Sequence, residues 1–217
     1  QSTTRIAITG AAGRMGRSLV VSCENRADIE LVAALEEASS PHIGSDPGIV
    51  AGAKPTGFEI GSSLTSVVDD VDVLIDFTTP ASTLANTATC RAAGTRMVIG
   101  TTGLGEDVRY LREASEDIAL VFAPNMSIGV NVCFRLVELA TRTLRDDFDV
   151  EVIEAHHRQK VDAPSGTAMR FGEIAAKNLD CDLTADAVYG REGRSGPRAA
   201  KTIGFATVRA GEIVGDH

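Results

Sequence analysis

Two adjacent histidines and a lysine lie within five residues of one another, at His156, His157 and Lys160. Imidazole and ammonium groups carry protons and positive charge near neutral pH, so this combination suits proton donation to a substrate or the binding of an anion. The one acid among them is Asp162. Three such groups in one short segment therefore predict that something negatively charged binds there.

The flanking residues predict a strand before these groups and a helix after them. Residues 148–154 alternate apolar and acidic side chains, which is typical of a half-buried strand. Pro164 and Ser165 are typical of a helix start, where free N–H groups and the helix dipole attract anions. Each feature alone also fits a solvated strand edge or an ordinary helix cap. Together they predict a site in which Ser165, Gly166 and Thr167 face an anion.

A glycine-rich turn near the start of the chain predicts a second binding function. Residues 4–9 form a short apolar strand pattern, and residues 10–16 follow with the spacing G-x-x-G-x-x-G. A helix pattern with Met15, Leu19 and Val20 comes next. A strand, a glycine turn and a helix are the context in which such glycines bind the pyrophosphate of a dinucleotide. Any tight strand-to-helix turn can also use glycines, so the motif alone leaves both interpretations open.

Further strand and helix patterns alternate after this turn. Strands are expected at 29–35, 71–76, 97–102 and 118–122, with one short strand at 58–60 inside an irregular stretch. This order predicts an α/β fold of the Rossmann type, with a doubly wound parallel sheet. Ligands bind such sheets at the carboxyl ends of the strands. The residues expected on that rim are Gly10, Ala11, Ala12, Gly13, Arg14, Met15, Glu36, Phe77, Thr78, Gly100, Thr101, Thr102, Ala123, Pro124, Asn125 and Met126.

We expect two domains, a dinucleotide-binding domain at 1–126 and an α+β substrate-binding and oligomerisation domain at 127–217. The second opens with an amphipathic helix at 127–144 and contains a helix at about 165–178. A glycine- and arginine-rich loop near the substrate is expected at 188–198, and a hairpin of strands 202–208 and 212–217 after it. Because the sequence stops within a strand pattern, we expect this domain to be incomplete.

The net charge, the length of the apolar runs and the cysteine spacing exclude several classes of protein. The net charge of −9 argues against nucleic-acid binding, which favours a basic surface. No apolar run approaches the ~20 residues that span a bilayer, so we expect no membrane segment. The four cysteines are scattered, which predicts neither disulfides nor a metal site and favours a cytoplasmic location.

Residues 156–168 resemble the signature of the 4-hydroxy-tetrahydrodipicolinate reductase (dihydrodipicolinate reductase) family, and the resemblance runs from Arg5 to His217. It implies NAD(P)H-dependent reduction of a cyclic dicarboxylate on the diaminopimelate route to lysine. Gly166 and Thr167 would bind one carboxylate, and His157 and Lys160 would face negative charge. His156 would donate a proton, although the family also gives Lys160 a donor role, and the order of the two stays open.

The resemblance also implies how the cofactor and the assembly are organised. Glu36 matches the acid that binds the adenosine ribose. Glu37 and Thr79 stand where some relatives carry arginines that pair with the phosphate of NADPH, so we expect NADH to bind at least as well as NADPH. Met126 stands where some members carry Phe. Family members are commonly homotetramers, so we expect a homo-oligomer.

Two other functions are worth testing against the residues. An extended short-chain dehydrogenase needs a Tyr-x-x-x-Lys pair, but Ala114 and Gly193 stand four residues after the two tyrosines, Tyr110 and Tyr189. An NAD-sensing regulatory domain without catalysis would explain the glycine turn. That alternative leaves the histidine pair without a role.

Overall fold

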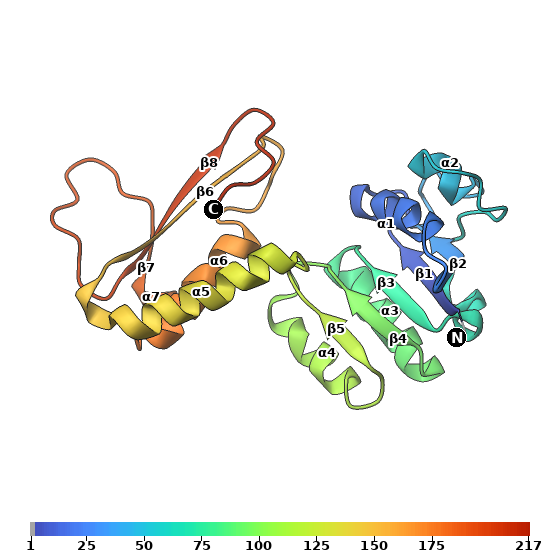
Figure 1. Ribbon diagram of the computed structural model, residues 1–217, viewed down its shortest axis with the longest axis horizontal. Coiled ribbons are helices and arrows are strands. Elements are labelled where there is room, and N and C mark those ends of the chain that lie inside the picture. Colours follow the sequence, from blue (N-terminus) through green and yellow to red (C-terminus); the bar gives the residue numbers. More distant parts are fainter. Residues whose placement is uncertain (1–2) are drawn as a thin grey trace. The chain divides into compact units, whose positions relative to one another are not determined.

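The computed structural model describes residues 3–217, which form two compact units that divide after Pro124 (Figure 1). The first unit contains one sheet of five parallel strands in the order β2-β1-β3-β4-β5. The strands are β1 (Thr4–Thr9), β2 (Ile29–Leu35), β3 (Val73–Asp76), β4 (Arg96–Ile99) and β5 (Leu120–Phe122). The predicted parallel α/β sheet is therefore confirmed.

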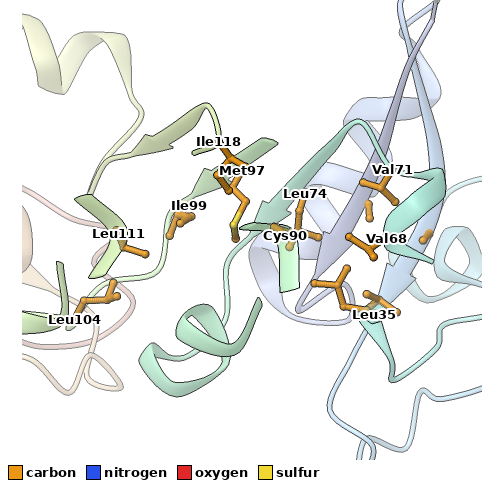
Figure 2. Packing of buried hydrophobic residues seen from close by; sticks show 13 residues of the cluster. Leu35, Val68, Val71, Leu74, Cys90, Met97, Ile99, Leu104, Leu111 and Ile118 are labelled. Carbon is orange, nitrogen blue, oxygen red and sulfur yellow. The ribbon is translucent and has the colours of Figure 1, made fainter. Parts of the chain in front are cut away.

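Helices connect these strands. They are α1 (Arg14–Glu24), α2 (Pro47–Ala51), α3 (Pro80–Ala93) and α4 (Val108–Ala114), with short 3-10 turns at Leu64–Ser66, Val68–Asp70 and Gly105–Asp107. Neighbouring residues of one strand belong to different apolar clusters, as Leu74 and Ile75 of β3 show. Strand residues alternate between the two faces of a sheet, so apolar residues at consecutive positions are typical of a sheet covered on both sides. Figure 2 shows the larger cluster, in which Leu74, Met97 and Ile99 are fully buried.

The strand predicted at 58–60 is wrong. Ile60 instead lies in a loop that reaches β2 through a single bridge from Leu35 to Gly61. The Asp46 carboxylate organises this region, because it accepts hydrogen bonds from the backbone N–H groups of residues 48, 49, 56 and 57. A carboxylate that gathers backbone donors in this way replaces the ladder that a strand would provide.

The second unit contains a sheet of three parallel strands in the order β6-β8-β7. The strands are β6 (Val150–His156), β7 (Ala187–Tyr189) and β8 (Ile203–Arg209), and the helices are α5 (Ile128–Leu144), α6 (Gly166–Asn178) and α7 (Leu183–Asp186), with a 3-10 turn at Arg145–Asp147. Helix α6 covers one face of the sheet. Gly172 allows its close approach, because a Cβ there would lie 2.5 Å from the Phe205 ring. Helix α5 packs beside α6, with the rings of Phe134 and Phe171 4.9 Å apart.

The hairpin predicted at 202–217 is also wrong. Strand β8 forms as expected, but residues 212–217 make no strand with it. Asp216 instead pairs antiparallel with Ala155 of β6, through backbone hydrogen bonds of 3.0 and 2.9 Å. The chain therefore crosses past the end of β8 and closes the outer edge of β6 near its carboxyl end.

The segment expected as a loop at 188–198 begins within β7 and is tied back to β6. Arg191 and Arg198 both bind the carboxylate of Glu151. Gly204 of β8 leaves room for that carboxylate, because a Cβ there would lie 1.9 Å from Glu151 Oε2.

Candidate active site

The five parallel strands bring most of the predicted cofactor residues to one edge of the first sheet. Gly10 follows β1, Glu36 follows β2, Phe77 follows β3, Gly100 follows β4 and Ala123 follows β5. Their common edge is the carboxyl end of the sheet, and Thr78, Thr101, Thr102 and Pro124 continue the same turns. Asn125 and Met126 belong to the second unit.

The glycine turn has the shape that a dinucleotide pyrophosphate needs. Gly10 has φ of +72°, and a Cβ there would lie 2.6 Å from the Phe77 carbonyl oxygen. A Cβ at Gly16 would lie 2.1 Å from the Gly10 oxygen, so α1 packs directly against the turn. Helix α1 starts after Gly13 with no side-chain cap, and Arg14 and Met15 in its first turn are exposed. Its N–H groups are therefore available to an anionic group.

Glu36 holds the same turn from β2. Its Oε1 accepts a hydrogen bond of 2.7 Å from the backbone N–H of Ala12. Arg17 Nε donates to the Ala12 carbonyl at 2.7 Å, and Arg17 Nη2 lies 3.4 Å from His42 Nε2. Both polar groups of the Ala12 residue are thus occupied, so the turn has a fixed conformation. Glu36 lies where a ribose-binding acid is expected, with one of its oxygens already used by the protein.

The buried carboxylate of Asp76 joins the turns after β3 and β4. Its side chain accepts hydrogen bonds from the hydroxyls of Thr78, Thr83 and Thr101 and from the Asn86 amide, at 2.6 to 3.2 Å. Thr101 Oγ1 in turn accepts from the Thr78 N–H at 3.0 Å. Two residues predicted to contact the cofactor are therefore fixed by one acid that the sequence analysis did not identify.

In the second unit, His156 is the last residue of β6 and is 9% exposed. Its Nδ1 lies 2.5 Å from Glu154 Oε2. Glu154 is 2% exposed and also accepts from both terminal nitrogens of Arg209, each at 2.8 Å, and from the N–H of Ser165 at 3.1 Å. Burial raises the pKa of Glu154, but the hydrogen bonds from Arg209, His156 and Ser165 outweigh it and lower that pKa to about 2. Glu154 is therefore ionised at neutral pH.

The start of α6 lies beside this cluster. Ser165 is the N-cap, and its Oγ accepts from the Ala168 N–H at 3.2 Å and lies 2.8 Å from His217 Nε2. Burial and the nearby His156 lower the pKa of His217. Gly166 is exposed, and Thr167 Oγ1 accepts a hydrogen bond of 3.3 Å from Asn125 Nδ2. This exposed helix start is connected to His156 through Glu154, which binds both the histidine and the Ser165 N–H, and it suits the binding of a carboxylate.

Two of the three positive groups in this segment have an acidic partner. Lys160 Nζ lies 2.7 and 3.0 Å from the two oxygens of Asp162, and Glu154 accompanies His156. Burial raises the pKa of Asp162, but Lys160 outweighs it and holds that pKa below its usual value. His157 is half-buried, and its Nδ1 has no hydrogen-bond partner in residues 3–217. A substrate carboxylate at Lys160 must therefore share it with Asp162.

An open cavity of about 850 Å³ lies between the 161–164 loop and strands β7 and β8. Tyr189, Phe205 and Met169 line it, together with Asp162. His156, Lys160 and Thr167 are absent from its lining, but Asp162, which pairs with Lys160, borders the cavity.

Three residues of this cluster were not predicted from the sequence: Glu154, Arg209 and His217. Period-two spacing could have found Glu154, because it falls on the same face of β6 as Val152 and His156, and these three are the buried residues of that strand. An acid at an inward position two residues before a histidine indicates a buried carboxylate–imidazole pair. Arg209 becomes recognisable only once β8 lies beside β6, because it is opposite His156 in the register.

No group of three or more metal-ligating side chains occurs within the described part of the chain. Likewise, none of the helices in residues 3–217 is long and apolar enough to cross a membrane.

Comparison with known proteins places these features in a family. A family model described as dihydrodipicolinate reductase, N-terminus, matches residues 4–126, and its C-terminus counterpart matches residues 129–217. The chain is 52% identical over 213 residues to the 4-hydroxy-tetrahydrodipicolinate reductase of Nitrosomonas europaea, covering 98% of this chain and 79% of that protein. The corresponding protein of Methylococcus capsulatus is 51% identical over 214 residues, covering 98% and 80%.

A solved structure agrees with this result. Dipicolinate-bound dihydrodipicolinate reductase from Paenisporosarcina sp. TG-14 is 28% identical with a TM-score of 0.71, over 99% of this chain and 81% of that one. The NAD complex of GenD2 from gentamicin A biosynthesis, at 17% identity and a TM-score of 0.58 over 82% of this chain and 54% of that one, shares only the fold. Because these matches extend over nearly its whole length, the chain belongs to the dihydrodipicolinate reductase family.

Proposed function

We propose that this protein catalyses the NAD(P)H-dependent reduction of 4-hydroxy-tetrahydrodipicolinate to tetrahydrodipicolinate, on the diaminopimelate route to lysine. The observation that carries the proposal is the pairing of buried His156 with Glu154 beside the exposed start of α6, in a chain of this family. The reductase from Paenisporosarcina described above is bound to dipicolinate, which supports a cyclic dicarboxylate as ligand.

The residues of the first unit fit a nicotinamide dinucleotide. Gly10 and Gly16 leave no space for a side chain at the turn, and the uncapped start of α1 presents N–H groups to the pyrophosphate. Glu36 is placed to bind the ribose hydroxyls. When bound, this cofactor supplies the hydride, while the protein supplies orientation and protons.

The residues of the second unit have separate roles in this proposal. Gly166 and Thr167 bind one substrate carboxylate at the start of α6, next to the Ser165 cap. His157 and Lys160 face the second negative group. His156 gives a proton to the substrate as the hydride arrives. It is favoured over Lys160 because an imidazole ordinarily exchanges its proton nearer to neutral pH than an ammonium does.

The substitutions His156→Gln and Thr167→Val test these roles. We expect His156→Gln to lower kcat by roughly 10²–10⁴-fold with a small effect on KM, because it removes a proton donor. Thr167→Val should mainly raise KM, because it removes a hydroxyl at the carboxylate site. NADH oxidation measured with and without the dicarboxylate substrate gives both constants. Near-normal turnover in His156→Gln would transfer the donor role to Lys160.

The regulatory alternative is not retained, because the relatives that match this chain are named as reductases and a sensor gives His156 no task. We further propose that NADH binds at least as well as NADPH, given Glu37 and Thr79. A cytoplasmic location, a homotetrameric assembly, and the division into a cofactor domain at 1–126 and a substrate and oligomerisation domain at 127–217 are part of the same proposal.

A further inference from the structure

The Glu154 carboxylate lies at the centre of a buried polar cluster. Its Oε2 is 2.5 Å from His156 Nδ1, and the two terminal nitrogens of Arg209 bind its two oxygens at 2.8 Å each. The backbone N–H of Ser165 supplies a further donor at 3.1 Å. A buried carboxylate with a two-pronged guanidinium and two more donors is held in one orientation. The orientation of the His156 ring is therefore fixed by Glu154, which is itself held by Arg209 and Ser165.

This arrangement also decides which ring nitrogen carries a proton. An ionised carboxylate can only accept hydrogen bonds, so His156 must present a protonated Nδ1 to Glu154. The other nitrogen, Nε2, is then the one that can exchange a proton with a ligand.

The far side of the ring is restricted as well. A Cβ at Gly215 would lie 2.9 Å from His156 Nε2, so only a glycine leaves space there without a shift of the ring or the chain. The His217 ring meets the His156 ring edge-on, with centroids 5.1 Å apart. Packing and hydrogen bonding thus favour the same ring orientation.

We propose that Glu154 and Arg209 are positioning residues for His156, which fix its Nδ1-protonated form and leave Nε2 as the nitrogen that exchanges a proton with a ligand. The catalytic consequence rests on the proposed reductase function. The protonation pattern itself does not, and it can be measured in the free protein.

Nitrogen-15 NMR of histidine-labelled protein tests the pattern directly. The chain has four histidines, so the spectrum is simple, and His156→Gln identifies the His156 signals. Recorded at the highest pH that the protein tolerates, wild type should show His156 protonated at Nδ1. Glu154→Gln should shift these signals towards a mixture with the Nε2-protonated form. The same variant should lower kcat on the order of tenfold or more with little change in KM. The form that delivers a proton from Nε2 while Nδ1 stays protonated is the imidazolium, and a neutral amide at position 154 stabilises this cation less than a carboxylate does.

Two further variants separate positioning from general damage. Arg209→Lys keeps the positive charge but loses the two-pronged contact, so it should give a smaller change of the same kind. Glu151→Gln is the matched control. Glu151 lies on the same strand and binds two guanidinium groups, but it does not touch His156. This control should leave the His156 signals unchanged.

Each outcome decides the proposal. Wild-type protein with His156 protonated at Nε2 and not at Nδ1 would overturn it without any variant, and so would an unchanged spectrum in Glu154→Gln. If Glu154→Gln does not fold, the wild-type and Arg209→Lys spectra decide. A protein that lacks reductase activity but shows Glu154-dependent protonation at Nδ1 would support the positioning and count against the proposed function.

Discussion

Glu37 lies directly after the residue proposed to bind the adenosine ribose, and its side chain is exposed. The extra phosphate of NADPH would meet this carboxylate, at a cost on the order of 1–3 kcal/mol. We expect calorimetry to give an NADH dissociation constant no larger than that for NADPH, and we expect Glu37→Arg to shift the ratio towards NADPH.

Glu30→Arg is the control for this prediction, because it makes the same change of charge near the amino end of β2. It should leave the ratio unchanged. Tenfold tighter binding of NADPH by wild-type protein would contradict the prediction and would point to Arg17, which lies beside the glycine turn.

The acid stability of the protein should depend on Glu154. Its pKa is lowered from 4.5 to about 2 on folding, so its contribution to the free energy of unfolding is complete above pH 4.5 and is lost as the pH falls towards 2. Urea unfolding at a series of pH values should show this loss in wild type and a weaker pH dependence in Glu154→Gln. Equal slopes for the two proteins between pH 4.5 and 2 would contradict the assignment.

At the scale of elements, the turns after β3 and β4 depend on a shared acid. Asp76→Asn replaces an acceptor with an amide, whose NH2 group must face either the threonine hydroxyls that donate to Oδ1 or the Asn86 amide that donates to Oδ2. Because Thr78 and Thr101 are proposed to contact the cofactor, we expect NADH to bind roughly tenfold more weakly, which corresponds to about 1.4 kcal/mol.

Asp72→Asn serves as the control for that measurement. Asp72 lies just before β3, at the opposite end of the strand, and binds Arg5. Its substitution should lower stability without changing the NADH dissociation constant measured by fluorescence. An Asp76→Asn protein with wild-type NADH affinity would show that these turns keep their geometry without the acid.

The five strands of the first unit could be predicted from sequence because each is a local apolar run, and the starts of α1 and α3 are marked by a glycine and by a Thr-Pro cap. The short helix α2 was not predicted, because it lies in a stretch expected to be irregular. The errors lie where the structure depends on distant partners. The loop around Ile60 follows from backbone donors collected by Asp46, and residues 212–217 pair with β6 and not with their sequence neighbour β8. The periodicity of the local sequence predicts neither this loop nor this pairing.

The candidate site shows the same division. His156 and the start of α6 could be identified because their residue types stand close together in the sequence. The groups that hold His156 come from β8 and from the last residues of the chain, so only the sheet register brings Arg209 and His217 to it. Long-range register is the part of the fold that a single sequence specifies least directly.

At the scale of the whole molecule, the proposed chemistry is divided between the two units. The cofactor turns belong to the first, and the histidine pair with the start of α6 belongs to the second. The overall charge of −9 would repel an anionic substrate at long range. We therefore expect binding of the proposed substrate to depend on local groups, the start of α6 and Lys160, more than on the total charge.

One face of the second sheet is covered by α6, and the opposite face leaves apolar side chains exposed. Ile153 of β6 is 65% exposed and Val208 of β8 is 47% exposed, with Ala155 and Ala206 beside them in the register. Exposed apolar groups on a sheet face favour association with an identical surface, since symmetric assemblies bury the same patch on each copy. This supports the proposal that the protein is a homo-oligomer formed through its second unit.

Light scattering coupled to gel filtration should then give a mass four times the chain mass of 22.7 kDa. Ile153→Lys should lower that mass, because it places a charge in the apolar patch that the assembly would bury. Ile49→Lys is the matched control, since Ile49 is 60% exposed but lies in the first unit, and it should leave the mass unchanged. A wild-type protein with the mass of one chain, or an equal effect of the two substitutions, would show that this face of the sheet is not the contact between copies.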